Sequence, residues 1–116
     1  MNGLPKILMR RDDARHTELD IEVTDDNPWF AGHFPEMAIL PGVVQIGWAV
    51  HFAYAVHGLG PGVRTLEQVK FKRPILPGAR LTLTLKVDPP AHKLRYEYKD
   101  AEHSYSSGTL LFEPSP

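Results

Sequence analysis

The sequence predicts an α+β fold in which one long central helix is wrapped by a curled antiparallel sheet. The first observation is an almost unbroken apolar run from Val43 to Val56, which contains no proline and is too long for a strand. The second is a set of short segments that alternate between apolar and polar residues and are joined by local turns, as in antiparallel sheets. A helix that is apolar on every side must be buried almost completely, so the sheet is expected to surround it.

The helix is expected to span Pro41–His57. Proline suits the first helical position, and Gly58 or Gly60 suits a C-terminal cap. The first fifteen residues are mixed and charged and are expected to form a loose lead-in, and residues 113–116 are expected to be a loose tail. The strands are expected where the alternation is clearest, at residues 16–24, 64–71, 80–87, 93–99 and 105–112.

The composition restricts the classes of function. A chain of 116 residues predicts one domain, with a core of about residues 16–113. A net charge of −1 argues against bulk electrostatic binding of nucleic acid, and the absence of cysteine excludes disulfides and thiolate catalysis. The N-terminus lacks the apolar segment of a signal peptide, and the apolar run is too short for a comfortable membrane span, so a cytoplasmic protein is expected.

Two motifs flank and follow the expected helix. The first is Gly32-His33-Phe34-Pro35, followed eight residues after His33 by Pro41-Gly42-Val43. The second is residues 69–78, Val-Lys-Phe-Lys-Arg-Pro-Ile-Leu-Pro-Gly. In order and spacing these blocks resemble the (3R)-hydroxyacyl-[acyl carrier protein] dehydratases of fatty-acid synthesis, over about residues 16–113. The Pro-Gly-Val-Val-Gln-Ile-Gly-Trp version is most similar to the dehydratase-like proteins of aryl-polyene pigment synthesis. The resemblance implies the hotdog fold, a long helix within a curled antiparallel sheet.

The implied reaction assigns roles to the first motif. Dehydrating a 3-hydroxyacyl thioester to the trans-2-enoyl thioester needs a base for the proton beside the carbonyl, an acid for the leaving hydroxyl and a donor to the enolate oxygen. His33 suits the base, because imidazole titrates near neutral pH. The N–H groups near Gly42 and Val43 begin a helix and suit the enolate oxygen, and Gly42 has no Cβ to obstruct the carbonyl. In the resembled family the matching histidine is catalytic and the matching glycine N–H binds the thioester oxygen.

The general acid is missing from its expected position. The resembled family carries Glu or Asp on the helix six residues after the motif proline, where this sequence has Gly47. An interior helical glycine costs roughly 1 kcal/mol relative to alanine, so Gly47 indicates room for a ligand. His51, one turn further on the same helix face, is one candidate for the acid. Glu67 is the other, because alternation places it on the same strand face as Val69 and Phe71. The alternatives are a core histidine, and a glutamate in a salt bridge or at the sheet edge.

Further residues are candidates for contacts with substrate and carrier. Direct substrate contacts are predicted for Phe34, Val43 and Gly47. Three basic residues of the second motif suit the acidic surface of an acyl carrier protein or the phosphate of its phosphopantetheine, or else form an ordinary solvated face: Lys70, Lys72 and Arg73. Gln45 and Trp48 are interpreted as packing or dimer-contact residues.

The sequence therefore predicts a 3-hydroxyacyl-[acyl carrier protein] dehydratase with no metal and no cofactor beyond the carrier's phosphopantetheine. One alternative is an acyl-thioesterase on the same fold, although Gly47 removes the obvious carboxylate. Another is a non-catalytic acyl-carrier-binding subunit of a dehydratase complex, and the absence of the helix carboxylate at Gly47 favours this reading. Because one sheet cannot cover a helix that is apolar on all sides, the sequence further predicts a homodimer, a larger homo-oligomer or pairing with a paralogous hotdog partner.

Overall fold

The computed structural model describes residues 3–30, 38–60 and 62–114. Its long helix, α1, spans Gly42–His57, and two short 3-10 turns, η1 and η2, span Pro28–Phe30 and Pro89–Ala91. The strands are β1 (Lys6–Asp12), β2 (His16–Glu22), β3 (Val63–Phe71), β4 (Arg80–Asp88), β5 (Lys93–Lys99) and β6 (Ser104–Phe112). They form one six-stranded sheet in the order β1-β2-β4-β5-β6-β3, with every neighbouring pair antiparallel.

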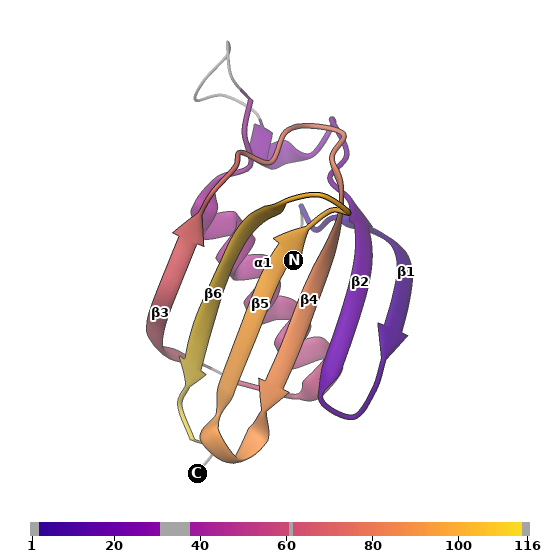
Figure 1. Cartoon of the computed structure of the whole chain (residues 1–116). Coiled ribbons are helices and arrows are strands. Elements are labelled where there is room, and N and C mark those ends of the chain that lie inside the picture. The colour runs from indigo at the N-terminus through magenta and orange to yellow at the C-terminus, as the bar shows by residue number, and fades with distance from the viewer. Residues whose placement is uncertain (1–2, 31–37, 61, 115–116) are drawn as a thin grey trace.

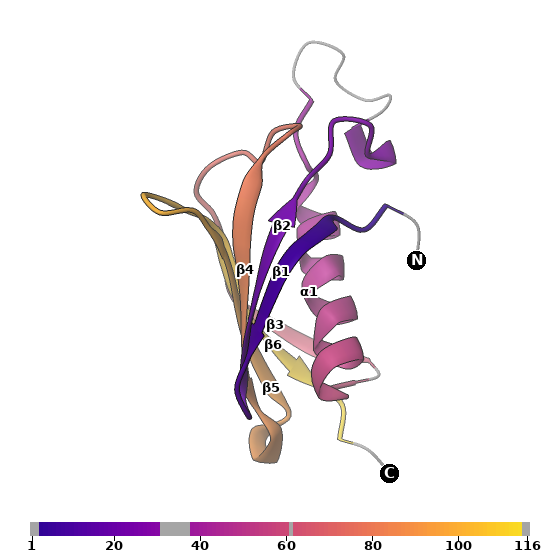
Figure 2. The same ribbon diagram turned by 90° about the vertical axis from the view of Figure 1, so that its right-hand side faces the viewer.

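Helix α1 lies along one face of the sheet, and the opposite face is open (Figures 1 and 2). The predicted α+β arrangement of one long helix against an antiparallel sheet is confirmed. Pro41 is the N-cap rather than the first helical residue, and Gly58 closes the helix in the left-handed conformation, with φ 67°. No helix within the described ranges is long and apolar enough to cross a membrane.

The expectation of a loose lead-in is wrong for β1. This strand pairs with β2 from Lys6 opposite Glu22 to Asp12 opposite Thr17, so the sheet begins before residue 16. All seven residues of β1 are exposed, so no buried face imposes an alternating pattern on its sequence. What marks the strand instead is charge pairing across the hairpin, as in the 2.8 Å contact between Arg11 Nη1 and Asp20 Oδ2.

The core lies between α1 and the inner face of the sheet. The predicted inward residues of β4 are all buried, namely Leu81, Leu83, Leu85 and Val87. Trp48 and Ala49 are fully buried at the centre of the helix. The period of two along the strands therefore identifies the face that receives α1.

The helix is not buried on every side. Its buried residues follow the spacing of a single face: Val44, Gln45, Trp48, Ala49, Phe52 and Ala53. On the other side Val43 is 77% exposed and Tyr54 is 61% exposed. The expectation of all-round burial is wrong for the single chain, because the sheet covers only one side of the helix.

A chain of hydrogen bonds ties the end of α1 to the β1–β2 hairpin. Thr17 Oγ1 is buried and lies 2.7 Å from Asp12 Oδ1 and 2.8 Å from His57 Nε2. A carboxylate only accepts, so the hydroxyl donates to Asp12 and His57 donates its Nε2–H to the hydroxyl oxygen. The bond from Thr17 lowers the pKa of Asp12, and desolvation lowers the pKa of His57. The arrangement fixes the neutral tautomer of His57.

Replacing Thr17 with Val should lower the free energy of unfolding by about 1–2 kcal/mol, because Asp12 and the half-buried His57 both lose a partner. Urea unfolding followed by circular dichroism measures the change. Thr109→Val is the matched control, since Thr109 is also a buried strand threonine and its hydroxyl makes no hydrogen bond among the described residues. Equal stability of the two variants would show that the chain of hydrogen bonds contributes nothing.

Candidate functional site

A cleft of about 390 Å³ opens where α1 begins. It is lined by the segment that enters the helix, by the first helical turn, and by the end of β3 with the residues that follow it. The helix start at Gly42, which belongs to the first motif, and the second motif therefore border the same cleft. The lining residues are Ile39, Leu40, Gly42, Gln45, Phe71, Lys72, Arg73 and Pro74.

The first turn of α1 presents free backbone donors to this region. The carbonyl of Pro41 accepts from the N–H groups of Val44 and Gln45, at 3.1 and 3.2 Å. Among the described residues, the N–H groups of Gly42 and Val43 meet no acceptor. The first N–H groups of a helix also carry the positive end of its dipole. The cleft can therefore bind an oxygen that carries or develops negative charge.

Gly42 is in close contact with the end of β3. A Cβ built on Gly42 would lie 2.7 Å from Cζ of Phe71, closer than two carbon atoms can approach. The ring of Phe71 is itself 53% exposed and so borders the cleft. The structure thus adds a second reason for glycine here: its lack of a side chain admits the Phe71 ring as well as any ligand.

A buried polar network sets the position of the helix start, and sequence reasoning missed it. Gln45 donates from Nε2 to the carbonyl of Leu40 at 3.1 Å and accepts from Ser106 Oγ at 2.6 Å. The hydroxyl of Tyr98 donates to the Gln45 carbonyl at 2.6 Å. Burial raises the pKa of Tyr98 well above its ordinary value, so this phenol stays protonated as a donor. A lone glutamine within an apolar run was the available signal, interpreted only as a packing or dimer-contact residue.

The other predicted residues of the first motif and the helix are placed as follows. His33 and Phe34 lie outside the described residues. Gly47 and His51 are both part-buried and lie one turn apart on α1. The His51 ring meets Phe52 edge to face, with centroids 5.1 Å apart. His51 is roughly 13 Å from Gly42 along the helix axis, from the rise of about 1.5 Å per residue.

Glu67 does not share a strand face with Phe71. Residues directly opposite each other in an antiparallel pair point to the same side of the sheet. Phe71 is opposite Ser106, whose hydroxyl contacts the helix. Glu67 is opposite Thr109, and Ser106 and Thr109 point to opposite faces because an odd number of steps along β6 separates them. The register shifts between Glu67 and Lys70, and Gln68 has a positive φ of 53°, so a bulge breaks the alternation used to place Glu67. The carboxylate lies on the sheet face opposite α1.

The basic residues of the second motif are divided by the same geometry. Lys72 and Arg73 line the cleft, while Lys70 lines a hollow on the open face of the sheet. In the described parts of the chain, no group of three or more His, Asp or Glu side chains is arranged to hold a metal ion.

Comparison with known sequences gives a consistent set of relatives. Residues 9–109 match the model of a family described as ApeI-like: ApeI dehydratase. A 3-hydroxyacyl-[acyl-carrier-protein] dehydratase FabZ from Brucella ovis is 39% identical over 84 residues, which are 65% of this chain and 54% of that protein. The FabZ of Ehrlichia chaffeensis is 31% identical over 96 residues, covering 78% and 65%. The chain thus spans about half to two thirds of the length of these curated relatives.

Comparison with solved structures covers nearly the whole chain. A chain of the dehydratase heterocomplex ApeI:P from Xenorhabdus doucetiae has a TM-score of 0.85 and 32% identity, over 92% of this chain and 96% of that one. An uncharacterised protein from Erwinia carotovora has a TM-score of 0.82 and 35% identity, over 96% and 97%. The dehydratase domain of a mycocerosic acid synthase-like polyketide synthase, with a TM-score of 0.70 and 16% identity over 100% of this chain and 41% of that one, supports the fold alone. The arrangement is the hotdog fold.

Replacing Gly42 with Ala should lower the free energy of unfolding by about 1 kcal/mol, the lower end of overpacking costs, because the half-exposed Phe71 ring can move aside. In a Phe71→Ala background the same change should cost nothing measurable, since the ring that the methyl group would meet is gone. Chemical unfolding of the parent, both single variants and the double variant closes the cycle. An equal cost in both backgrounds would contradict the contact.

Proposed function

Because the chain belongs to the ApeI-like dehydratase family, we propose that it removes water from a 3-hydroxyacyl thioester carried on acyl carrier protein and releases the trans-2-enoyl thioester. The observation that supports the proposal is that the helix start at Gly42 and the second motif border one cleft, where the N–H groups of Gly42 and Val43 meet no acceptor among the described residues. These donors suit the developing enolate oxygen of such a reaction.

In the proposed reaction, His33 takes the proton from the carbon beside the thioester carbonyl. The electron pair moves onto the carbonyl oxygen, where the N–H groups of Gly42 and Val43 stabilise the negative charge. When the pair returns, the carbon–oxygen bond at C3 breaks and the hydroxyl leaves as water after gaining a proton. Val43, Gly47 and Phe34 are the proposed substrate contacts, with Phe71 added by its position beside Gly42.

The proton for the leaving hydroxyl has two proposed sources in this chain. His51 lies on the helix face that Gly47 opens, roughly 6 Å beyond Gly47 along the axis. A water molecule in the space left by Gly47 can bridge this distance to the substrate. Glu67 is the weaker candidate, because its carboxylate lies on the sheet face opposite α1.

A second proposed function is that of a carrier-binding subunit that supports a catalytic partner. Two observations favour it: the helix carboxylate of the resembled dehydratases is replaced by Gly47, and the Xenorhabdus relative is part of a heterocomplex. Dehydration and thioester hydrolysis should therefore be assayed on the purified chain alone and after co-expression with a paralogous hotdog protein. Turnover by the chain alone would exclude the subunit role.

We also propose that the chain works as a homodimer, a larger homo-oligomer or a pair with a paralogue. Apolar surface remains uncovered on the open side of α1, at Val43 and Tyr54, and along the edge strand β3, at Leu66 and Phe71. Within the described part of the chain, the outer edge of β3 has no neighbouring strand, so its backbone can pair with another strand. Light scattering of the same preparations gives the assembly state for each assay.

Replacing His33 with Ala should reduce the dehydration rate about 10²–10⁴-fold, the usual cost of losing a general base, and should leave the thermal unfolding midpoint close to that of the parent. The assay follows enoyl-thioester formation on a 3-hydroxyacyl carrier protein. His103→Ala, in the β5–β6 turn, is the matched control and should retain the parent rate. A His33→Ala variant with full activity would place the base elsewhere.

Replacing His51 with Gln should reduce the rate about 10²-fold or more if His51 protonates the leaving group. Adding Gly47→Glu in that background should recover part of the rate, because it restores a carboxylate at the position that the resembled family uses. The parent should have a bell-shaped pH–rate profile, since the base must be deprotonated while the acid is protonated. If His51→Gln has no effect, His51 is not the acid, and Glu67→Gln is the next variant to assay.

A further inference from the structure

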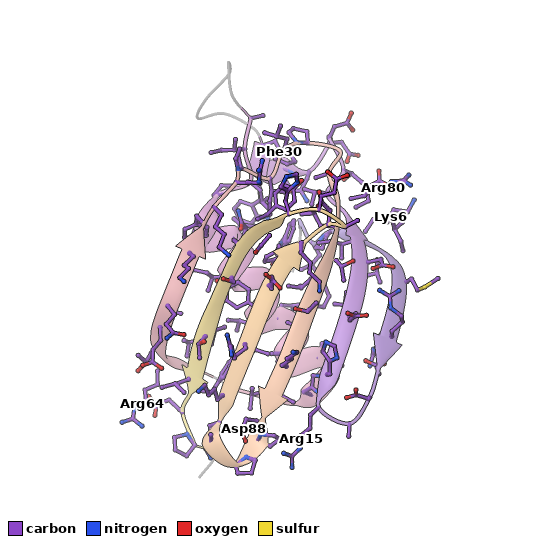
Figure 3. The ribbon with its side chains drawn as sticks, in the orientation of Figure 1. Lys6, Arg15, Phe30, Arg64, Arg80 and Asp88 are labelled. Carbon is purple, nitrogen blue, oxygen red and sulfur yellow. The ribbon has the colours of Figure 1, made fainter. Side chains whose placement is uncertain are left out.

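The open face of the sheet carries a hollow of about 350 Å³, here named the outer groove. Figure 2 shows that α1 covers only the other face, and Figure 3 looks directly onto the open one. Four basic side chains from three strands and the residue after β3 line the outer groove, together with one acidic residue: Lys70, Lys72, Lys86, Arg95 and Glu97. The acidic Glu67 lies beside it, on the same face.

The basic residues of the outer groove are not neutralised within the chain. Among the described residues, no carboxylate oxygen lies within 4 Å of the charged nitrogen atoms of these four side chains. Toward the β1 edge of the same sheet, by contrast, the basic residues are paired. Arg11 pairs with Glu18 and Asp20, and Arg80 pairs with Glu22. The chain as a whole has a net charge of −1, whereas the outer groove brings together four basic side chains and one acidic one, so the groove is locally positive.

Two of these basic residues oppose each other directly. Lys86 on β4 is the cross-strand partner of Arg95 on β5. Like charges in directly opposite positions destabilise a sheet, and most exposed strand positions could accept an opposite charge at no cost to packing. A pair that weakens the free protein, without a compensating contact inside the chain, indicates a partner that supplies the negative charge.

The outer groove is connected to the cleft at Gly42. Lys72 lines both hollows, because it follows the last residue of β3 at the point where the chain passes from the open face toward the helix start. Arg73 continues the positive charge into the cleft. A partner on the outer groove would therefore lie next to the entrance that a flexible, negatively charged substrate arm must use.

We propose that the outer groove docks the acidic surface of the acyl carrier protein, with Lys86 and Arg95 as the remote contact and Lys72 at the entrance to the cleft. The inference rests on the proposed function, because that function supplies a carrier protein as the partner. Charge complementarity favours an acidic protein, which spans the width of several strands, over a single small anion. Glu97 gives the surface a negative position that the partner must accommodate.

The test uses the full chain and a fluorescently labelled holo acyl carrier protein, whose binding is measured by anisotropy without any need for turnover. Lys86→Glu should weaken carrier binding roughly tenfold, as expected for reversing one charge of a steering patch. The same change puts a carboxylate opposite Arg95, so the urea unfolding midpoint should rise. Lys6→Glu, which makes the same charge change on the far edge strand β1, is the matched control and should leave binding within about twofold of the parent.

Lys86→Glu should raise the unfolding midpoint and weaken carrier binding, so a loss of binding by this variant cannot be attributed to a folding defect. Lys70→Glu, at another strand of the outer groove, should also weaken binding, and the difference between parent and Lys86→Glu should shrink as salt is added. Equal binding by Lys86→Glu and Lys6→Glu would overturn the proposal. An effect that disappears with apo carrier would assign the groove to the phosphopantetheine phosphate, and loss of an assembly in light scattering would assign it to a second copy; either result overturns it.

The two proposals fail in different ways. Groove-dependent carrier binding without turnover would refute the dehydratase activity and leave the docking surface in place. Turnover of carrier-linked substrate that Lys86→Glu leaves unchanged in kcat/KM would refute the docking surface and leave the activity in place. A parent that binds no carrier protein would refute the docking surface directly.

Discussion

The seating of the first turn of α1 on the sheet is the interaction on which the site depends. Gln45 is held by Leu40 on the entering segment and by Ser106 on β6, and Tyr98 on β5 fixes its carbonyl. Because all three bonds are buried, breaking any one leaves an unsatisfied group, which costs more than the bond itself contributes. The network therefore fixes how far the free N–H group of Gly42 projects toward the end of β3. A helix held only by apolar packing could slide along the sheet and would present these donors less reproducibly.

The bulge at Gln68 gives β3 two functions at once. Glu67 is opposite Thr109 and Lys70 is opposite Ser107, so three steps along β3 match two along β6. The extra residue allows Lys70 to point to the open face while Phe71 points to Gly42. A positive φ at a non-glycine residue costs of the order of 1–2 kcal/mol, so the chain tolerates this strain at the strand that borders both the cleft and the outer groove.

The parts of the fold that were predictable from the sequence are those in which burial imposes a period. The alternation in β4 and the apolar run closed by Gly58 identified the inner face and the helix end, because a one-residue error would expose core side chains. Strand β1 was not predicted, because every one of its residues is exposed. The predicted strand face of Glu67 was wrong, because a bulge leaves no trace in apolar periodicity. Gly42 and the second motif border the cleft, but the bonding of Gln45 was not predictable. Whether a buried amide finds partners depends on strands far away in the sequence.

Three features of this chain reduce its stability, and their positions argue for function. Gly47 lies inside the helix at a cost of roughly 1 kcal/mol, Gln68 holds a left-handed conformation, and Lys86 opposes Arg95. Core packing explains none of them, because Gly47 is only part-buried while Gln68 and Lys86 are exposed. Local rules are broken in natural proteins chiefly where a ligand or partner compensates. Gly47 lies on the helix that begins at the cleft, and the other two line the hollow that Lys72 joins to it, so one binding path accounts for all three.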